Sequence, residues 1–164
     1  MACYTYENIV TSKISPDRLF KAFFMDGMRL MKEVVPDKIK GCQFINGRGE
    51  PGSVYLLHLN EGNHSKTLKV RVDSFDKENM IHKATLLGGE GFADLYESMS
   101  RETKIEAKPD NEGSVVKIIT TCHTKREVTS EEKLKQHEVG MKRAVAMVQA
   151  VETYLLPNPD DHTT

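Results

Sequence analysis

The chain has 164 residues, of which 38% are hydrophobic and 29% are charged, and its formal net charge is -1 at pH 7. This length and composition predict one folded domain over residues 1–164 with a sizeable core. The near-neutral charge argues against a nucleic-acid-binding protein. In addition, no apolar run approaches the roughly 20 residues that span a bilayer.

The N-terminal part predicts one strand followed by two short helices. Residues 3–12 are rich in tyrosine, isoleucine and valine, which favour a strand. Ser15 and Pro16 indicate a helix start, because serine is a good N-cap and proline fits the first turn. Asp26-Gly27 interrupts this helix, and a second one is expected over about 28–34. The two helices are expected to form a V.

Six further strands are predicted in the middle of the chain, and they are separated mostly by turns rich in glycine, asparagine and aspartate. In residues 66–72, apolar and polar side chains alternate, which indicates a strand with one buried face. The Gly88-Gly89 pair predicts one of the turns. The expected strands are 40–45, 53–60, 66–75, 79–87, 95–106 and 113–122.

The last element is a long helix. Thr129 and Glu132 have the spacing of a capping box, and the helix should run to about Leu156, before Pro157. We expect the tail 157–164 to fray. One apolar stripe should face the sheet, formed by Leu134, Met141, Ala144, Val145, Val148, Val151 and Leu155.

The order of elements predicts an α+β fold in which a curved antiparallel sheet of seven strands surrounds one long helix. Such a sheet can enclose more volume than its own side chains fill. The eight methionines would give an internal cavity adaptable walls. Composition alone leaves two alternatives open, a permissive cavity and a packed core.

A loop containing Gly47, Gly49 and Gly52 lies between two β-prone segments. A phosphate-binding loop would lead into a helix N-terminus, but here the strand sequence that starts near Val54 follows. Nucleotide binding through this loop is therefore not expected.

Neither a metal nor another cofactor is expected. Cys3, Cys42 and Cys122 are widely spaced and form no Cys-x-x-Cys pair, which suits a reducing compartment. The N-terminus lacks the basic and apolar regions of a signal peptide, so we expect a cytoplasmic location.

Several phrases in order along the chain resemble the plant pathogenesis-related class 10 proteins, the family of the major birch pollen allergen. They are Arg18-Leu19-Phe20-Lys21-Ala22-Phe23, Met25-Asp26-Gly27, Gly47-x-Gly49-x-Pro51-Gly52, Lys108-Pro109-Asp110, His123-Thr124-Lys125 and Val151-Glu152-Thr153-Tyr154-Leu155-Leu156. The chain departs from the family pattern at Glu50, where another glycine is usual, and by a small insertion near 126–130.

The resemblance implies a helix-grip fold with a large internal cavity. It also implies a monomeric defence or stress protein that binds apolar or amphipathic molecules such as phytohormones, flavonoids, alkaloids or lipids. The glycine-rich loop of Gly47, Gly49 and Gly52 would then be a rigid hairpin and a surface epitope.

Projecting strand and helix periodicity onto this fold gives a predicted cavity lining. Its members point to the concave side of the sheet, to the inner side of the helical V, or from the long helix toward the sheet. They are Phe23, Met31, Ile39, Tyr55, Leu57, Leu59, Leu68, Val70, Val72, His82, Ala84, Leu86, Met99, Arg101, Thr103, Val116, Ile118, Val139, Met141, Arg143 and Ala144.

The polar members of this set carry the chemical hypotheses. Arg101 and Arg143 could bind an acidic ligand through charge-assisted hydrogen bonds. Alternatively, each arginine reaches the cavity mouth or pairs with a nearby acid. His82 is interpreted as a neutral hydrogen-bonding residue of the wall.

Two enzymatic alternatives follow from the family resemblance. Norcoclaurine synthases use a lysine in the strand before the long helix, where this chain has Lys117, although alternation points Lys117 outward. A ribonuclease activity is also ascribed to the family. Glu152 and Tyr154 match two of its proposed residues, but Tyr55 replaces the lysine. A carrier without catalytic residues is the preferred prediction.

Overall fold

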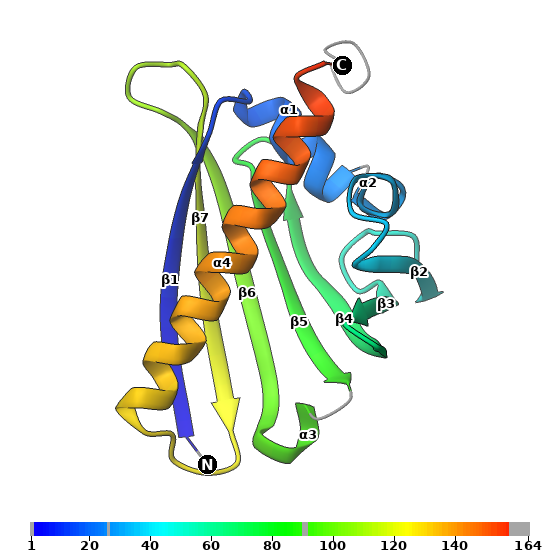
Figure 1. The fold of residues 1–164 in the computed structure, drawn as a ribbon, viewed down its shortest axis with the longest axis vertical. Coiled ribbons are helices and arrows are strands. Elements are labelled where there is room, and N and C mark those ends of the chain that lie inside the picture. The colour runs from blue at the N-terminus through cyan, green and yellow to red at the C-terminus, as the bar shows by residue number, and fades with distance from the viewer. Residues whose placement is uncertain (1, 26, 90–91, 158–164) are drawn as a thin grey trace.

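The computed structural model describes residues 2–25, 27–89 and 92–157. Within them, seven antiparallel strands form one curved sheet in the order β1-β7-β6-β5-β4-β3-β2 (Figure 1). The strands are β1 (Ala2–Ser12), β2 (Ile39–Asn46), β3 (Val54–Glu61), β4 (His64–Asp76), β5 (Ile81–Gly89), β6 (Tyr96–Ala107) and β7 (Ser114–Thr124).

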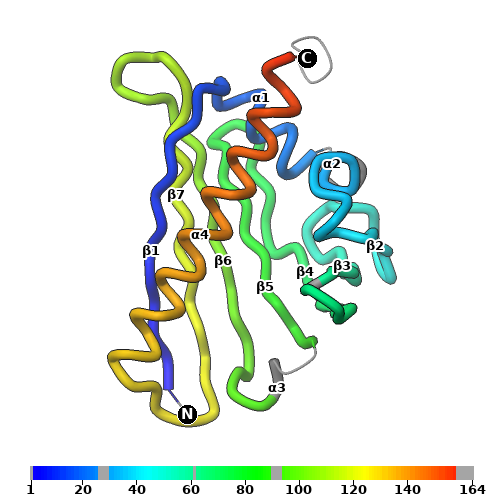
Figure 2. Tube along the Cα trace, viewed as in Figure 1, coloured from blue at the N-terminus to red at the C-terminus, as the bar shows by residue number. Residues whose placement is uncertain are grey.

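Helical segments pack on this sheet. They are α1 (Pro16–Phe20), the π-helical η1 (Lys21–Met25), α2 (Gly27–Val34), α3 (Phe92–Leu95) and α4 (Ser130–Leu155). In Figure 2, α4 crosses in front of the sheet from the β1 end to the helices α1 and α2. The predicted helix-grip fold is therefore confirmed. Of the predicted tail 157–164, only Pro157 lies within the described residues.

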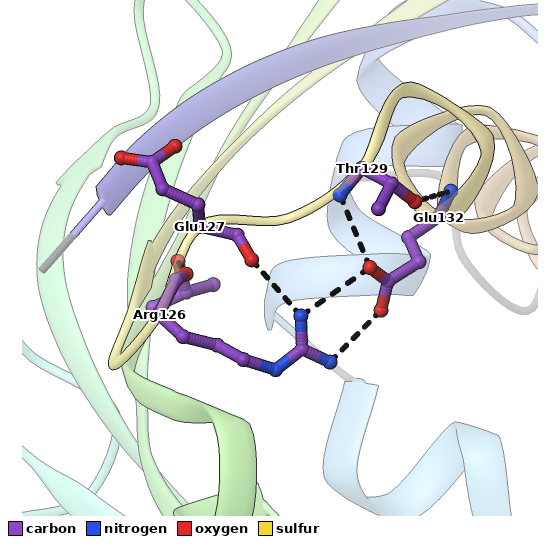
Figure 3. A network of polar contacts seen from close by, with 5 residues as sticks. Arg126, Glu127, Thr129 and Glu132 are labelled. Carbon is purple, nitrogen blue, oxygen red and sulfur yellow. Dashed lines mark hydrogen bonds and ion pairs between the residues drawn. The ribbon is translucent and has the colours of Figure 1, made fainter.

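Helix α4 begins at the predicted capping box. The Thr129 backbone N–H donates to Glu132 Oε1 at 3.0 Å, and the Glu132 N–H donates to Thr129 Oγ1 at 3.1 Å. The Arg126 guanidinium also holds the Glu132 carboxylate, at 3.0 Å from Nη2 to Oε2 (Figure 3). Hydrogen bonding to Arg126 is the main reason that the pKa of Glu132 falls to about 2. The start of the helix is thus fixed by the sequence.

Polar contacts dock the first half of α4 on β1. His137 Nε2 donates to the carbonyl oxygen of Glu7 at 2.8 Å, and Asn8 Nδ2 donates to the carbonyl oxygen of His137 at 3.3 Å. Gly140 permits the close approach, because a Cβ there would lie 2.9 Å from Asn8 Oδ1. Leu134, predicted to face the sheet, is instead 58% exposed.

Apolar packing docks the second half of α4. Val148, Val151 and Leu155 are buried in the main hydrophobic core together with residues of β1, β6, β7, α1 and α2. At the end of the helix, Arg18 Nη2 donates to the Leu155 carbonyl at 3.1 Å. The core therefore sits where α4 meets the two N-terminal helices.

The glycine-rich loop is a compact hairpin between β2 and β3. Gly47, Gly49 and Gly52 all have positive φ angles, of 75°, 121° and 95°. The Ser53 hydroxyl accepts a hydrogen bond from the Gly49 N–H at 3.0 Å, and a Cβ on Gly47 would lie only 2.2 Å from the same oxygen. No helix follows, so the loop lacks the geometry of a phosphate cradle.

Some local predictions were wrong. The turn predicted at Gly88-Gly89 is strand, because β5 continues through both glycines in pairing with β4. The first predicted helix continues as the π-helical segment η1, and the short α3 was not predicted. Ser15 is the N-cap of α1, but its side chain makes no capping hydrogen bond within the described residues.

Candidate functional site

A cavity of about 520 Å³ lies on the concave side of the sheet. Strands β3 to β6 form most of its wall, α4 contributes Gln136 and Arg143, and η1 contributes Phe24. The complete lining is Phe24, Tyr55, Leu57, Lys66, Leu68, Val70, His82, Ala84, Leu86, Tyr96, Met99, Arg101, Thr103, Gln136 and Arg143. The cavity thus occupies the half of the concave side that the core leaves unfilled.

Strand register explains how the lining converges. Arg101 on β6 lies opposite Ala84 on β5, His82 lies opposite Thr103, and Leu86 lies opposite both Val70 and Met99. Side chains of directly opposed residues point to the same face. The structure therefore brings together eleven of the predicted lining residues: Tyr55, Leu57, Leu68, Val70, His82, Ala84, Leu86, Met99, Arg101, Thr103 and Arg143. Their role in ligand binding stays a prediction.

The other predicted lining residues lie outside the wall of this cavity. Most belong to the main core or pack against it, because α4 closes on the sheet at that end: Phe23, Met31, Val116, Ile118, Met141 and Ala144. Ile39 and Val72 are buried at 5% and 3% exposure, while Leu59 and Val139 are half-buried. These residues do not line this cavity, and their role in ligand binding stays a prediction.

The π-helical turn η1 decides which phenylalanine reaches the cavity. A π-turn inserts one extra residue and rotates the following side chains relative to an α-helix. Phe24 lines the cavity and also packs against the core, whereas Phe23 packs against the core without lining the cavity. The sequence prediction assumed a regular helix and chose Phe23.

Phe24 stacks directly on His82, with ring centroids 4.2 Å apart and planes 10° from parallel. Phe75 meets the same imidazole edge-on at 5.8 Å. Burial lowers the pKa of His82 to about 4, and the charge of Asp73 only partly opposes this effect. His82 is therefore a neutral member of an aromatic wall at physiological pH.

The polar part of the lining is basic. Lys66, Arg101 and Arg143 contribute cationic groups, and no described aspartate or glutamate lines the cavity. Arg101 projects from the middle of the sheet to the concave side, yet it is exposed to solvent. Its side chain thus borders space that water can enter.

Tyr55 adds a hydroxyl to the cavity wall. Burial, and secondarily the charge of Cys42, raise the pKa of Tyr55 to about 12, while Arg101 acts in the opposite direction. Tyr55 is therefore a neutral phenol that can donate a hydrogen bond.

Sequence reasoning missed Phe24, Lys66, Tyr96 and Gln136. Lys66 has the same parity as Leu68 and Val70, so strand alternation could have found it. Gln136 precedes Arg143 by seven residues and lies on the same helix face. Tyr96 was hidden by a register shift between Tyr96 and Ser98, which breaks the alternation along β6.

The residues of the two enzymatic alternatives lie elsewhere. Lys117 points away from the core face of β7 and pairs with Glu106, at 3.3 Å from Nζ to Oε1. Glu152 accepts a hydrogen bond from the Lys13 N–H at 3.1 Å, and the Tyr154 hydroxyl donates to Glu33 at 3.0 Å. These three side chains make contacts outside the cavity that Tyr55 lines.

Residues 1–158 match the family model described as the pathogenesis-related protein Bet v 1 family. The chain is 38% identical over 160 residues to the major allergen Pru ar 1 of Prunus armeniaca, with 98% of each chain covered. It is 36% identical over 161 residues to the major allergen Mal d 1 of Malus domestica, again with 98% of each covered.

Solved structures agree with these sequence matches. The crystal structure of Ara h 8.0201 superposes with a TM-score of 0.81 at 30% identity, covering 96% of this chain and all (100%) of the other. Norcoclaurine synthase of Thalictrum flavum has the same fold at 17% identity, with a TM-score of 0.72 and coverage of 96% and 88%. This chain therefore belongs to the pathogenesis-related protein Bet v 1 family.

Proposed function

We propose that the protein binds a hydrophobic or amphipathic small molecule in its internal cavity and carries it without changing it. The observation that supports this proposal is the cavity itself. Its volume of about 520 Å³ falls within the range of roughly 300–1,000 Å³ that is common for small-molecule sites. Its wall combines aliphatic and aromatic side chains with a few polar groups.

The ligand classes that the family resemblance implies fit this wall. Phytohormones, flavonoids, alkaloids and lipids all combine apolar surface with a small number of polar groups. A related fold, that of norcoclaurine synthase, has been solved in complex with dopamine and hydroxybenzaldehyde, which are small aromatic molecules. A role in plant defence or stress would follow from the ligand that is carried.

Catalysis in the same cavity is less well supported. A general acid or base works best when its pKa lies near the working pH. The pKa of His82 is lowered to about 4, so this imidazole is a weak base at neutral pH. Lys117 is engaged with Glu106 outside the cavity. Carriage requires neither group to titrate.

Displacement of a neutral apolar dye, such as Nile red, tests the proposal. Apolar ligands should displace the dye from the wild type and should be recovered with unchanged mass. Ala84→Phe adds bulk inside the cavity and should weaken dye binding, whereas Leu87→Phe on the outer side of β5 should not. Circular dichroism would verify that both variants fold.

Two results would contradict carriage. Dye binding that is equally strong in the wild type and in Ala84→Phe would place the ligand outside the cavity. A change in ligand mass that depends on His82 would establish an enzyme instead. Native mass spectrometry of protein purified from plant extract would then identify the natural occupant.

A further inference from the structure

The middle of the concave wall holds a charge where a core residue would be expected. Arg101 lies at the centre of β6, flanked on the same face by Met99 and Thr103. The residue opposite Arg101 on β5 is Ala84, whose short side chain leaves space beside the guanidinium. The other neighbour, Thr120 on β7, is only 1% exposed.

The position of this charge agrees with its electrostatic effects. Arg101 opposes the rise in the pKa of Tyr55 on β3 and that of Cys122 on β7. One guanidinium therefore acts on groups from both sides of the concave wall. Within the described residues, Arg101 makes no hydrogen bond or ion pair with another side chain.

The surroundings favour an anion beside Arg101. Lys66 and Arg143 add positive charge to the lining, and no described carboxylate belongs to it. Charge-assisted hydrogen bonds from a guanidinium to a carboxylate are short and strong. Their strength increases in a cavity with largely apolar walls.

The rest of the wall selects the body of the ligand. The stacked pair Phe24 and His82 presents flat aromatic surface, and Leu57, Leu68 and Leu86 supply aliphatic surface. A planar apolar body can pack against these groups while a polar end reaches Arg101. The two kinds of surface lie in one cavity.

We propose that the cavity selects amphipathic molecules that carry one carboxylate, and that Arg101 is the residue that binds this carboxylate. This inference rests on the proposed carrier function and specifies its ligand class. A neutral molecule of the same shape would leave the guanidinium without its partner. The preference should therefore depend on the charge at residue 101.

Isothermal titration calorimetry with naphthoic acid and naphthamide tests this inference at neutral pH and low salt. The two molecules have nearly the same shape, but only the acid is charged. The wild type should bind the acid about tenfold or more tightly, as a charged hydrogen bond provides. Arg101→Gln should abolish this preference, and Arg101→Lys should retain part of it.

Lys69→Gln is the matched control. It removes the same charge from an exposed position on the outer face of β4 and should leave the preference unchanged. Equal affinity of the wild type for acid and amide would overturn the inference, even if Arg101→Gln failed to fold. It would also leave the carrier function intact, whereas failure of both ligands and of Nile red to bind would contradict the carrier function itself.

Discussion

Replacing His82 by phenylalanine should make the protein less sensitive to acid. In the native state, burial favours the neutral imidazole and lowers its pKa to about 4 from the ordinary value of 6.5. The unfolded chain therefore binds more protons than the native protein between these two values. It follows that the free energy of unfolding falls as the pH decreases through this window.

The structure sets the size of this effect. A difference of one unit in pKa corresponds to about 1.4 kcal/mol. The titration of His82 should therefore lower the free energy of unfolding of the wild type by about 3 kcal/mol between neutral pH and pH 4. In the wild type, the rings of His82 and Phe24 stack with centroids 4.2 Å apart. Phenylalanine at residue 82 keeps a ring for this stack but cannot titrate. The carboxylates titrate in both proteins, and their contribution cancels in the difference.

Urea unfolding followed by far-ultraviolet circular dichroism at a series of pH values measures both proteins. On acidification from neutral pH to about pH 4, the free energy of unfolding of the wild type should fall by about 3 kcal/mol more than that of His82→Phe. A constant offset caused by altered packing would not matter. If the two curves stay parallel over this range, His82 is not a buried neutral group and the described cavity wall is wrong.

Three further changes test the fold by the same unfolding measurement. Leu155→Ala should cost about 2–5 kcal/mol because the side chain is fully buried, whereas the exposed Leu156→Ala should cost little. Gly47→Ala should cost about 1–3 kcal/mol, since φ is 75° and Ser53 crowds the new Cβ; Gly41→Ala, with open space around it, lacks that clash. Thr129→Ala should cost about 1 kcal/mol through loss of the cap; no change would contradict the capping role.

Much of the fold was predictable because its signals are local. The capping box of Thr129 and Glu132 fixes the start of α4 whatever surrounds it. Alternation in β4 likewise determines that Leu68 and Val70 share a face. Gly88 and Gly89 were misinterpreted because the same residues occur in turns and, where a partner strand such as β4 is available, in extended strand.

The site was predictable only in part because its boundary is set by tertiary packing. Alternation identified the concave face, but it could not tell that α4 fills the end near Val116 and leaves the end near Leu86 open. That outcome depends on where the helix lies on the sheet. Irregularities of a single residue, the π-turn before Phe24 and the register shift at Tyr96, then changed which aromatic rings enter the cavity.

The position of Arg101 offers a physical reason why the cavity stays open. Collapse of the wall around an unpaired guanidinium would remove its hydration, and burying an uncompensated charge costs more than the apolar contacts would return. Leu86 and Met99 on the same wall can be dehydrated at no such cost. Among the described residues no side chain pairs with Arg101, so water or an anionic guest would satisfy it. The residue proposed to recognise the ligand would therefore also preserve the space that holds it.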